Sequence, residues 1–442
     1  MNKNMRNKFN IYFMMIKTIT FKQQLINLLR TGFLFFIIFH TLIAQPLAIK
    51  GGKIITISGS VIEKGTILID GGIIRDVGLD IKIPKDAEII DARGQIIMPG
   101  LIDAMTYYGI DPKDLNESIK PISPELRIIE AYYPFGKFGD GSGEIKANDL
   151  LSGGITTIYI APGDATILGG QGAIVQTAAS SFDEMIIKAP AAIDMTFGSK
   201  PGKINRKENR APVTKMAAIS QLRETLIKAQ EYQNNTTTTT NLGMEALGQL
   251  LERKIPARIQ ANSPGDIRSA INLANEFKFD LIIDGGASAD SYIKEIVKGN
   301  IPIILGPVSH PYISGEEIPD YLEYLSIDEG LAGRLEKAGI NIAFGSFSYG
   351  LGSLAKGITG KWLLIDAAIS TGYGMSEQAV LRSITLGAAE ILGVDSKLGS
   401  IEKGKQADII LLDGNPLSIK TWVQKVYISG RLVYSKKNNS IY

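Results

Sequence analysis

Residues 97–107, with the sequence IMPGLIDAMTY, decide the fold of this chain. An apolar run ends in Pro-Gly, resumes as a short apolar segment and then passes into polar residues. Pro-Gly is a strong break in local structure, so the second segment starts a new element. The pattern is typical of the first strand of a barrel that is entered from a preceding β-domain.

Short strand patterns precede this stretch in residues 45–98 and return in residues 398–442. Asp70-Gly71-Gly72 in the first segment and Ser429-Gly430 in the second are hairpin turn signals. Two β-segments that flank one α/β body are expected to pair with each other. We therefore predict one composite β-sandwich domain, built from the N-terminal and C-terminal segments.

Residues 99–397 alternate strand-like apolar runs with helical patterns, as a parallel barrel does. Six of the eight expected strands can be placed from the sequence. Residues 111–148 and 180–255 give no clear strand. The fold class is therefore α/β, with a TIM-like (β/α)8 barrel between the two β-segments.

A glycine-rich stretch follows the predicted strand at residues 156–160. We predict a loop that contains Gly169, Gly170, Gln171 and Gly172. Backbone N–H groups in such a loop could hold an anion or a carboxylate. A plain connecting loop is the simpler interpretation, because no Gly-Lys-Ser/Thr follows.

Both ends of the α/β body resemble the amidohydrolase superfamily. The family opens with Pro-Gly-Leu-Ile-Asp-Ala and then His-x-His, and residues 99–104 match the first part. The family ending, Gly-Ser-Ile-x-x-Gly-x-x-Ala-Asp, a strand and Asp-x-x-Pro, matches residues 399–416. The resemblance covers roughly residues 47–442 and is strongest to exported, imidazolonepropionase-like members. It implies hydrolysis of a C–N bond, as in a cyclic amide, with zinc or another divalent metal.

The resemblance also implies where the metal ligands stand, at the ends of barrel strands. Here those positions carry other residues: Met105 and Tyr107 on strand one, Gln260 on strand five, Gly285 on strand six and Phe347 on strand eight. The ligand on strand four cannot be placed. Glycine and phenylalanine side chains cannot bind a metal, and methionine suits softer metals than the hydrolytic ones. We therefore expect no metal cofactor and a barrel mouth whose former ligand positions could line a pocket.

Metal loss is hard to compensate. A bound metal lowers the pKa of water from about 15.7 to about 7, which is worth roughly 11 kcal/mol. A positioned carboxylate base contributes a factor of about 10² to 10⁴. The chain has two histidines, His40 near the N-terminus and His310, so no multi-histidine site can form.

Three polar residues remain weak catalytic candidates. Asp103 and Asp284 could form a metal-free acid/base pair, although Asp103 could equally satisfy backbone donors near a tight turn. His310 follows the predicted strand at 301–305 and could serve as a general base or bind a ligand. A loop histidine beside two prolines is the simpler interpretation of His310.

Three functional hypotheses follow. The first is a non-catalytic homologue that pairs with an intact amidohydrolase, forms a homo-oligomer or binds a small molecule. The second is a surviving metal-independent hydrolase that uses carboxylates at the barrel mouth. The third is a scaffold with neither ligand nor chemistry.

The N-terminus addresses the cellular compartment. Residues 1–44 carry six Lys or Arg and no Asp or Glu, and residues 32–39 are almost entirely apolar. This is typical of an export signal, cut near Ala44-Gln45, and predicts a periplasmic or extracellular protein with no stable membrane span after cleavage. An uncleaved inner-membrane anchor is the alternative.

The remaining composition excludes other classes of partner and chemistry. Of 47 basic residues, 41 remain outside the N-terminal segment against 45 acidic ones, so the net charge is −4 and no basic patch suggests nucleic acid. The absence of cysteine excludes disulfides and thiolate catalysis.

Overall fold

The computed structural model describes residues 45–111, 113–134, 136–137, 144–145, 147–235, 239–306, 308, 328–347 and 360–436. The predicted export signal at residues 1–44 and the candidate His310 lie outside these ranges. The chain from Leu47 onward forms one compact unit. Within the described residues, no helix is both long and apolar enough to cross a membrane.

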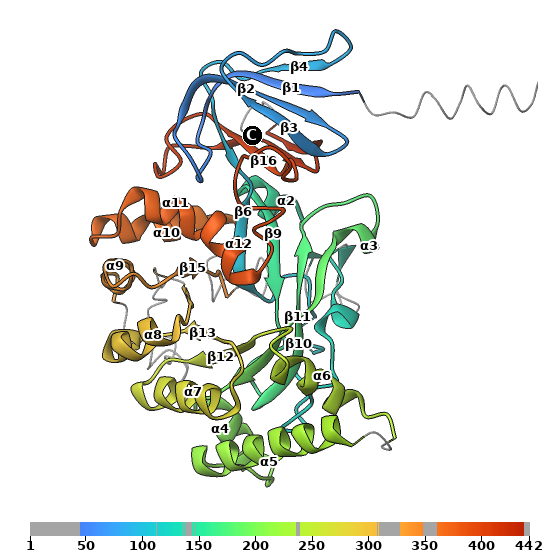
Figure 1. The fold of residues 1–442 in the computed structure, drawn as a ribbon, viewed down its shortest axis with the longest axis vertical. Helices are drawn as coiled ribbons and strands as arrows, with labels where there is room; N and C mark the ends of the chain where they lie inside the picture. Colours follow the sequence, from blue (N-terminus) through green and yellow to red (C-terminus); the bar gives the residue numbers. More distant parts are fainter. Residues whose placement is uncertain are drawn as a thin grey trace, which may run out of the picture. The chain divides into compact units, whose positions relative to one another are not determined.

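The two chain ends form one mixed sheet, in which the blue N-terminal strands and the red C-terminal strands lie together (Figure 1). Its order is β18-β17-β16-β5-β1-β2-β3, and β4 also pairs with β1. The strands are β1 (Leu47–Ile54), β2 (Ile62–Asp70), β3 (Ile73–Gly78), β4 (Glu88–Asp91), β5 (Ile96–Pro99), β16 (Ile409–Leu412), β17 (Val423–Ile428) and β18 (Arg431–Ser435).

The junction between the two ends is the antiparallel pairing of β5 with β16, where Met98 lies opposite Ile410. Alternating apolar side chains on these strands form a core of their own, which includes Ile49, Ile97 and Leu411. The predicted composite β-domain is thus confirmed, as one continuous mixed sheet that encloses its own core.

The central part of the chain forms an eight-stranded, nearly closed barrel. Its strand order is β15-β14-β13-β12-β11-β10-β9-β6. The strands are β6 (Leu101–Thr106), β9 (Ile155–Ile160), β10 (Leu168–Gln176), β11 (Ile186–Thr196), β12 (Ala257–Ala261), β13 (Leu281–Gly285), β14 (Ile303–Leu305) and β15 (Ile342–Phe344). After β15, the Phe347 N–H donates to the Met105 carbonyl on β6 at 2.8 Å, which brings the first and last strands together.

Helices surround the barrel strands (Figure 1). They are α2 (Ala147–Ser152), α3 (Phe182–Met185), α4 (Lys200–Lys207), α5 (Lys215–Asn234), α6 (Leu242–Leu251), α7 (Pro264–Phe277), α8 (Ile293–Gly299), α9 (Leu331–Lys337), α10 (Leu363–Gly372), α11 (Glu377–Ser383) and α12 (Leu386–Leu392). Short 3₁₀ helices lie at Ile128–Ala131, Ala289–Tyr292 and Gly360–Trp362, and a small hairpin pairs β7 (Gly136–Lys137) with β8 (Glu144–Ile145).

The helix α7 illustrates how the sequence sets these elements. Ser263 accepts from the Asp266 N–H, and the Asp266 carboxylate accepts from the Ser263 N–H, which completes a capping box. The helix ends at Lys278, whose left-handed φ of 64° stops it before β13. The two caps fix where α7 begins and ends, and the strands that it connects, β12 and β13, pair directly with each other.

The loop predicted around Gly169, Gly170, Gln171 and Gly172 is wrong, because these residues belong to β10. This strand runs antiparallel to both β9 and β11, and no helix separates it from β9. The barrel therefore keeps eight strands but departs from strict β/α alternation at its third strand.

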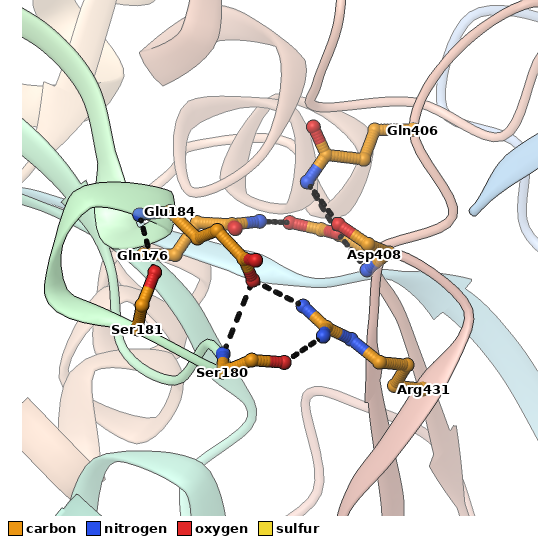
Figure 2. Close-up of polar contacts among 8 residues, drawn as sticks. Gln176, Ser180, Ser181, Glu184, Gln406, Asp408 and Arg431 are labelled. Atoms are coloured by element: carbon orange, nitrogen blue, oxygen red, sulfur yellow. Dashed lines mark hydrogen bonds and ion pairs between the residues drawn. The ribbon is translucent and has the colours of Figure 1, made fainter. Parts of the chain in front are cut away.

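A polar cluster connects β10 and α3 to the C-terminal strands (Figure 2). The buried Asp408 carboxylate accepts from Gln176 Nε2 at 2.9 Å, the Ser429 N–H at 2.8 Å and Gln406 Nε2 at 3.2 Å. Burial raises the pKa of Asp408 to about 6, against the effect of these hydrogen bonds. The Ala-Asp of the C-terminal motif is therefore a structural hydrogen-bonding centre.

Candidate functional site

The Asp103 carboxylate joins the first barrel strand to the last one. It is fully buried and accepts from Ser346 Oγ at 2.5 Å, the Ser346 N–H at 2.9 Å and the Met105 N–H at 3.2 Å. Ser346 Oγ also lies 3.2 Å from Thr106 Oγ1. Burial raises the pKa of Asp103 to about 6, although these donors favour the ionised form.

Met105 and Phe347, two of the predicted former ligand positions, lie together at this junction. Their backbones are joined by the 2.8 Å hydrogen bond, and Phe347 has a left-handed φ of 49°. A Cβ on Gly345 would lie 2.7 Å from the Met105 Cβ, so the two segments pack closely. Tyr107, the other position on strand one, is buried just beyond the end of β6.

Gln260 and Gly285 lie at the ends of the neighbouring strands β12 and β13. Gln260 pairs with Asp284, and Ala261 pairs with Gly285. Gly285 has a φ of 87°, and a Cβ there would collide with the side-chain amide of Asn262. A side chain at residue 285 would therefore be strained by the backbone conformation and would require Asn262 to move.

The fourth barrel strand is β11, whose ligand position could not be placed from the sequence. Thr196 on β11 pairs with Gln260 on β12, and Asp194 pairs with Arg258. Side chains two residues apart on a strand share a face, so Asp194 and Thr196 lie on the same side of the sheet as Arg258 and Gln260.

A buried charged cluster, which the sequence reasoning missed, occupies this side of the barrel. We call Tyr159, Asp194, Arg258 and Asp284 the barrel cluster. Arg258 binds Asp284 through both carboxylate oxygens, with Nη2 at 2.7 Å from Oδ1 and Nε at 3.0 Å from Oδ2. Its guanidinium carbon lies 3.7 Å from the centre of the Tyr159 ring. The Tyr159 hydroxyl donates to Asp194 Oδ2 at 2.8 Å.

Burial dominates the electrostatics of the barrel cluster. Arg258 and Asp284 have side-chain exposures of 0% and 4%. Desolvation raises the pKa of Asp284, and the bound guanidinium opposes that rise. Desolvation also raises the pKa of Asp194 to about 8, which the charge of Arg258 and hydrogen bonds from Tyr159 and the Gly172 N–H only partly offset.

Gly172 has a specific packing role beside the cluster. A Cβ at this position would overlap the Tyr159 hydroxyl and lie 2.6 Å from Asp194 Oδ2. The absence of a side chain therefore lets β10 approach the tyrosine–aspartate pair. The Gly172 N–H donates to the carboxylate of the chain's own Asp194.

One nitrogen of the Arg258 guanidinium, Nη1, makes neither of the two hydrogen bonds to Asp284. Nη1 is buried and has no hydrogen-bond partner among the described residues. An unpaired buried donor costs about 1–3 kcal/mol, so an acceptor oxygen is expected at this nitrogen. Arg258 and Asp194 could have been suspected from the sequence, because each interrupts an apolar strand, in Ala257-Arg258-Ile259 and Ile193-Asp194-Met195.

The five positions that the family resemblance predicts to correspond to metal ligands carry no histidine and no carboxylate. Their side chains are a thioether, a phenol, an amide, a phenyl ring and no side chain at all. Over the part of the chain that the structure describes, no three His, Cys, Asp or Glu residues are grouped so that they could hold a metal ion. Asp103 and Asp284 each accept hydrogen bonds from another side chain, Ser346 and Arg258 respectively.

Comparison with known proteins agrees with the fold. A model described as the amidohydrolase family matches residues 318–433. The crystal structure of an amidohydrolase from Thermotoga maritima MSB8 aligns with a TM-score of 0.78 at 29% identity, over 88% of this chain and all of that one.

Two curated proteins are similar over most of the chain. Amidohydrolase tasK from Hapsidospora irregularis is 23% identical over 409 residues, which cover 83% of this chain but only 39% of that protein. A 5-methylthioadenosine/S-adenosylhomocysteine deaminase from Symbiobacterium thermophilum is 24% identical over 428 residues, 84% of this chain and 85% of the deaminase. The chain thus spans about two fifths of the first relative and most of the second.

The barrel, the composite sheet and these similarities together define the class: the chain is a member of the amidohydrolase superfamily.

Proposed function

We propose that this chain is an exported, non-catalytic amidohydrolase homologue, which binds a small ligand or pairs with an intact relative. The observation that carries the proposal is the set of residues at the former ligand positions. Met105, Gln260, Gly285 and Phe347 stand at the ends of β6, β12, β13 and β15, and none can replace a histidine or a carboxylate toward zinc.

The state of the two carboxylates also supports the proposal. A general base needs a carboxylate that can reach a substrate proton. Asp103 already accepts three hydrogen bonds, and Asp284 is bound through both oxygens by Arg258. Both are therefore occupied by structural contacts.

The alternative is a metal-independent C–N hydrolase that uses Asp103. One observation favours it, namely the pKa of about 6, which lies near the range that general acid/base catalysis requires. The buried hydrogen bonds to Ser346 argue against it, because the carboxylate would have to leave them to reach a substrate.

Metal content tests the proposal. Purified residues 45–442 are incubated with zinc, manganese and iron, desalted and analysed by plasma mass spectrometry, beside an intact zinc amidohydrolase as the loading control. We expect much less than 0.1 metal ion per chain. About one retained ion per chain would refute metal loss and direct attention to His310.

Two further measurements separate the partner, ligand and export components. Co-purification with an intact homologue at a fixed ratio would favour the pairing function, and a monodisperse single chain would favour ligand binding. Cell fractionation with and without residues 1–44 tests export, for which we expect the truncated chain to stay inside the cell.

A further inference from the structure

We propose that the Arg258 guanidinium is a permanent internal cation that holds barrel strands together in place of a metal ion. This inference rests on the proposed loss of the metal site. It assigns a function to the barrel cluster. The four side chains of the cluster come from β9, β11, β12 and β13, and β10 lies between β9 and β11 in the sheet.

The geometry places one cation at the centre of these contacts. Arg258 on β12 binds Asp284 on β13 with two nitrogens, and its guanidinium faces the Tyr159 ring on β9 at 3.7 Å. The Tyr159 hydroxyl continues the connection to Asp194 on β11. A metal ion joins strands in the same way, by collecting side chains from several strand ends around one positive charge.

The charges are consistent with this function. A carboxylate without a counter-charge is unfavourable at a site with no solvent contact. The positive charge of Arg258 lowers the pKa of both Asp284 and Asp194, against the effect of burial. Guanidinium stays protonated at every working pH and presents a flat, two-pronged donor that matches a carboxylate, so its charge is as permanent as that of a metal ion.

The arrangement is also specific to arginine. The flat face of guanidinium stacks on the Tyr159 ring while its edge binds Asp284, which a lysine ammonium cannot reproduce. Gly172 leaves the room that Tyr159 and Asp194 need on the other side. Side chains of β9 and β13 therefore contact Arg258 directly, and β10 and β11 pack against its tyrosine neighbour.

A double-mutant cycle at pH 8 tests the inference by thermal unfolding of the purified full-length exported chain. The variants are R258M, which has a similar volume without charge, R258K, D284N and R258M/D284N. We expect R258M to lower the unfolding temperature by about 5 °C, since it leaves a buried carboxylate without its cation. We expect R258K to lose less than R258M.

The decisive variant is R258M/D284N, which removes both charges. If Arg258 acts as the counter-charge, the second substitution recovers at least half of the loss caused by the first. Losses that simply add would overturn the inference, as would an R258M variant as stable as the wild type. If R258M does not fold, soluble R258M/D284N supports the inference and insoluble R258M/D284N refutes it.

The same samples separate this inference from the proposed function. Wild-type unfolding is measured with EDTA and with 1 mM zinc or manganese, and we expect no change. A rise with metal would refute the proposed metal loss, even where the cycle shows coupling. If the losses in unfolding temperature add and metal does not change unfolding, only the proposed role of Arg258 as an internal cation is refuted.

Discussion

Asp103 and Asp284 are both buried aspartates on barrel strands, but the chain stabilises them in opposite ways. Asp103 depends on neutral donors, the Ser346 hydroxyl and two backbone N–H groups. Asp284 depends on one guanidinium that is itself fully buried. The first arrangement surrounds the carboxylate with neutral hydrogen-bond donors, whereas the second pairs it directly with a cation.

The difference determines how each region should respond to change. Burial raises the pKa of Asp103 more than its hydrogen-bond donors lower it, so acidification should stabilise the fold at this residue. A carboxylate paired with arginine leaves a second buried charge behind when it is removed. The two regions should therefore differ in how much stability a mutation costs.

The largest expected effect is the loss of Asp284. D284N leaves Arg258 without its counter-charge, and we expect about 3–5 kcal/mol of destabilisation in urea unfolding. D280N is the matched control, because Asp280 pairs with Arg253 at the surface and should cost less than about 1 kcal/mol. Equal losses for the two variants would contradict the distinction between the buried pair and the exposed pair.

The pH dependence of stability should be set by Asp103 and by the other buried carboxylates. The folded pKa of Asp103 is raised to about 6 from 3.8, so the folded state binds the proton more tightly than the unfolded state. Stability should therefore rise as the pH falls from 8 toward 4.5, with about 2 kcal/mol from this residue over that range. Asp408 and Asp194, with pKa values of about 6 and about 8, act in the same direction.

The D103N variant isolates the contribution of Asp103. It has no carboxylate to titrate, so its stability should rise less steeply on acidification than that of the wild type. Urea unfolding at pH 4.5, 6 and 8 measures this slope. A D103N variant with the wild-type slope would show that Asp103 does not titrate in this range.

The sequence predicted the regions whose local patterns are unambiguous. The hairpin turn at Gly71-Gly72 and the apolar runs around β5 and β16 identified the composite sheet. Strands β12, β13 and β15 follow helical patterns, so their alternation could be recognised. The family motifs added the order in which these elements meet.

The sequence did not reveal β10 and β11, for physical reasons. Glycines have weak strand propensity, and the strand from Gly169 to Gly172 depends on contacts with residues distant in sequence, such as the packing of Gly172 against Tyr159 and Asp194. The barrel cluster was missed for a related reason, since the pairing of Arg258 with Asp284 spans 26 residues of sequence. The former ligand positions remain predictions that the metal measurement tests.

A smaller loss of stability is expected from a substitution at Gly172, which packs against Tyr159 and Asp194 of the barrel cluster. G172A places a methyl group against the Tyr159 hydroxyl and the Asp194 carboxylate, so we expect about 1–3 kcal/mol of destabilisation. Urea unfolding measures the loss. G372A is the control, because a Cβ at Gly372, the last residue of α10, meets nothing within 4 Å. A neutral G172A variant would mean that β10 can move away from the cluster at no cost.

The smallest loss of stability is expected when one of the neutral hydrogen-bond donors to Asp103 is removed. S346A deletes the hydroxyl that donates to Asp103 Oδ2 but keeps the backbone N–H that donates to Oδ1, so one of three hydrogen bonds is lost. We expect about 1–2 kcal/mol at pH 8 and less at pH 5, because the protonated carboxyl depends less on donors. S269A is the control, since that hydroxyl only donates back to the Gly265 carbonyl within α7 and should matter by less than about 0.5 kcal/mol. A loss for S346A that equals the loss for D284N, or that grows on acidification, would show that the neutral and the charged arrangements are not distinct.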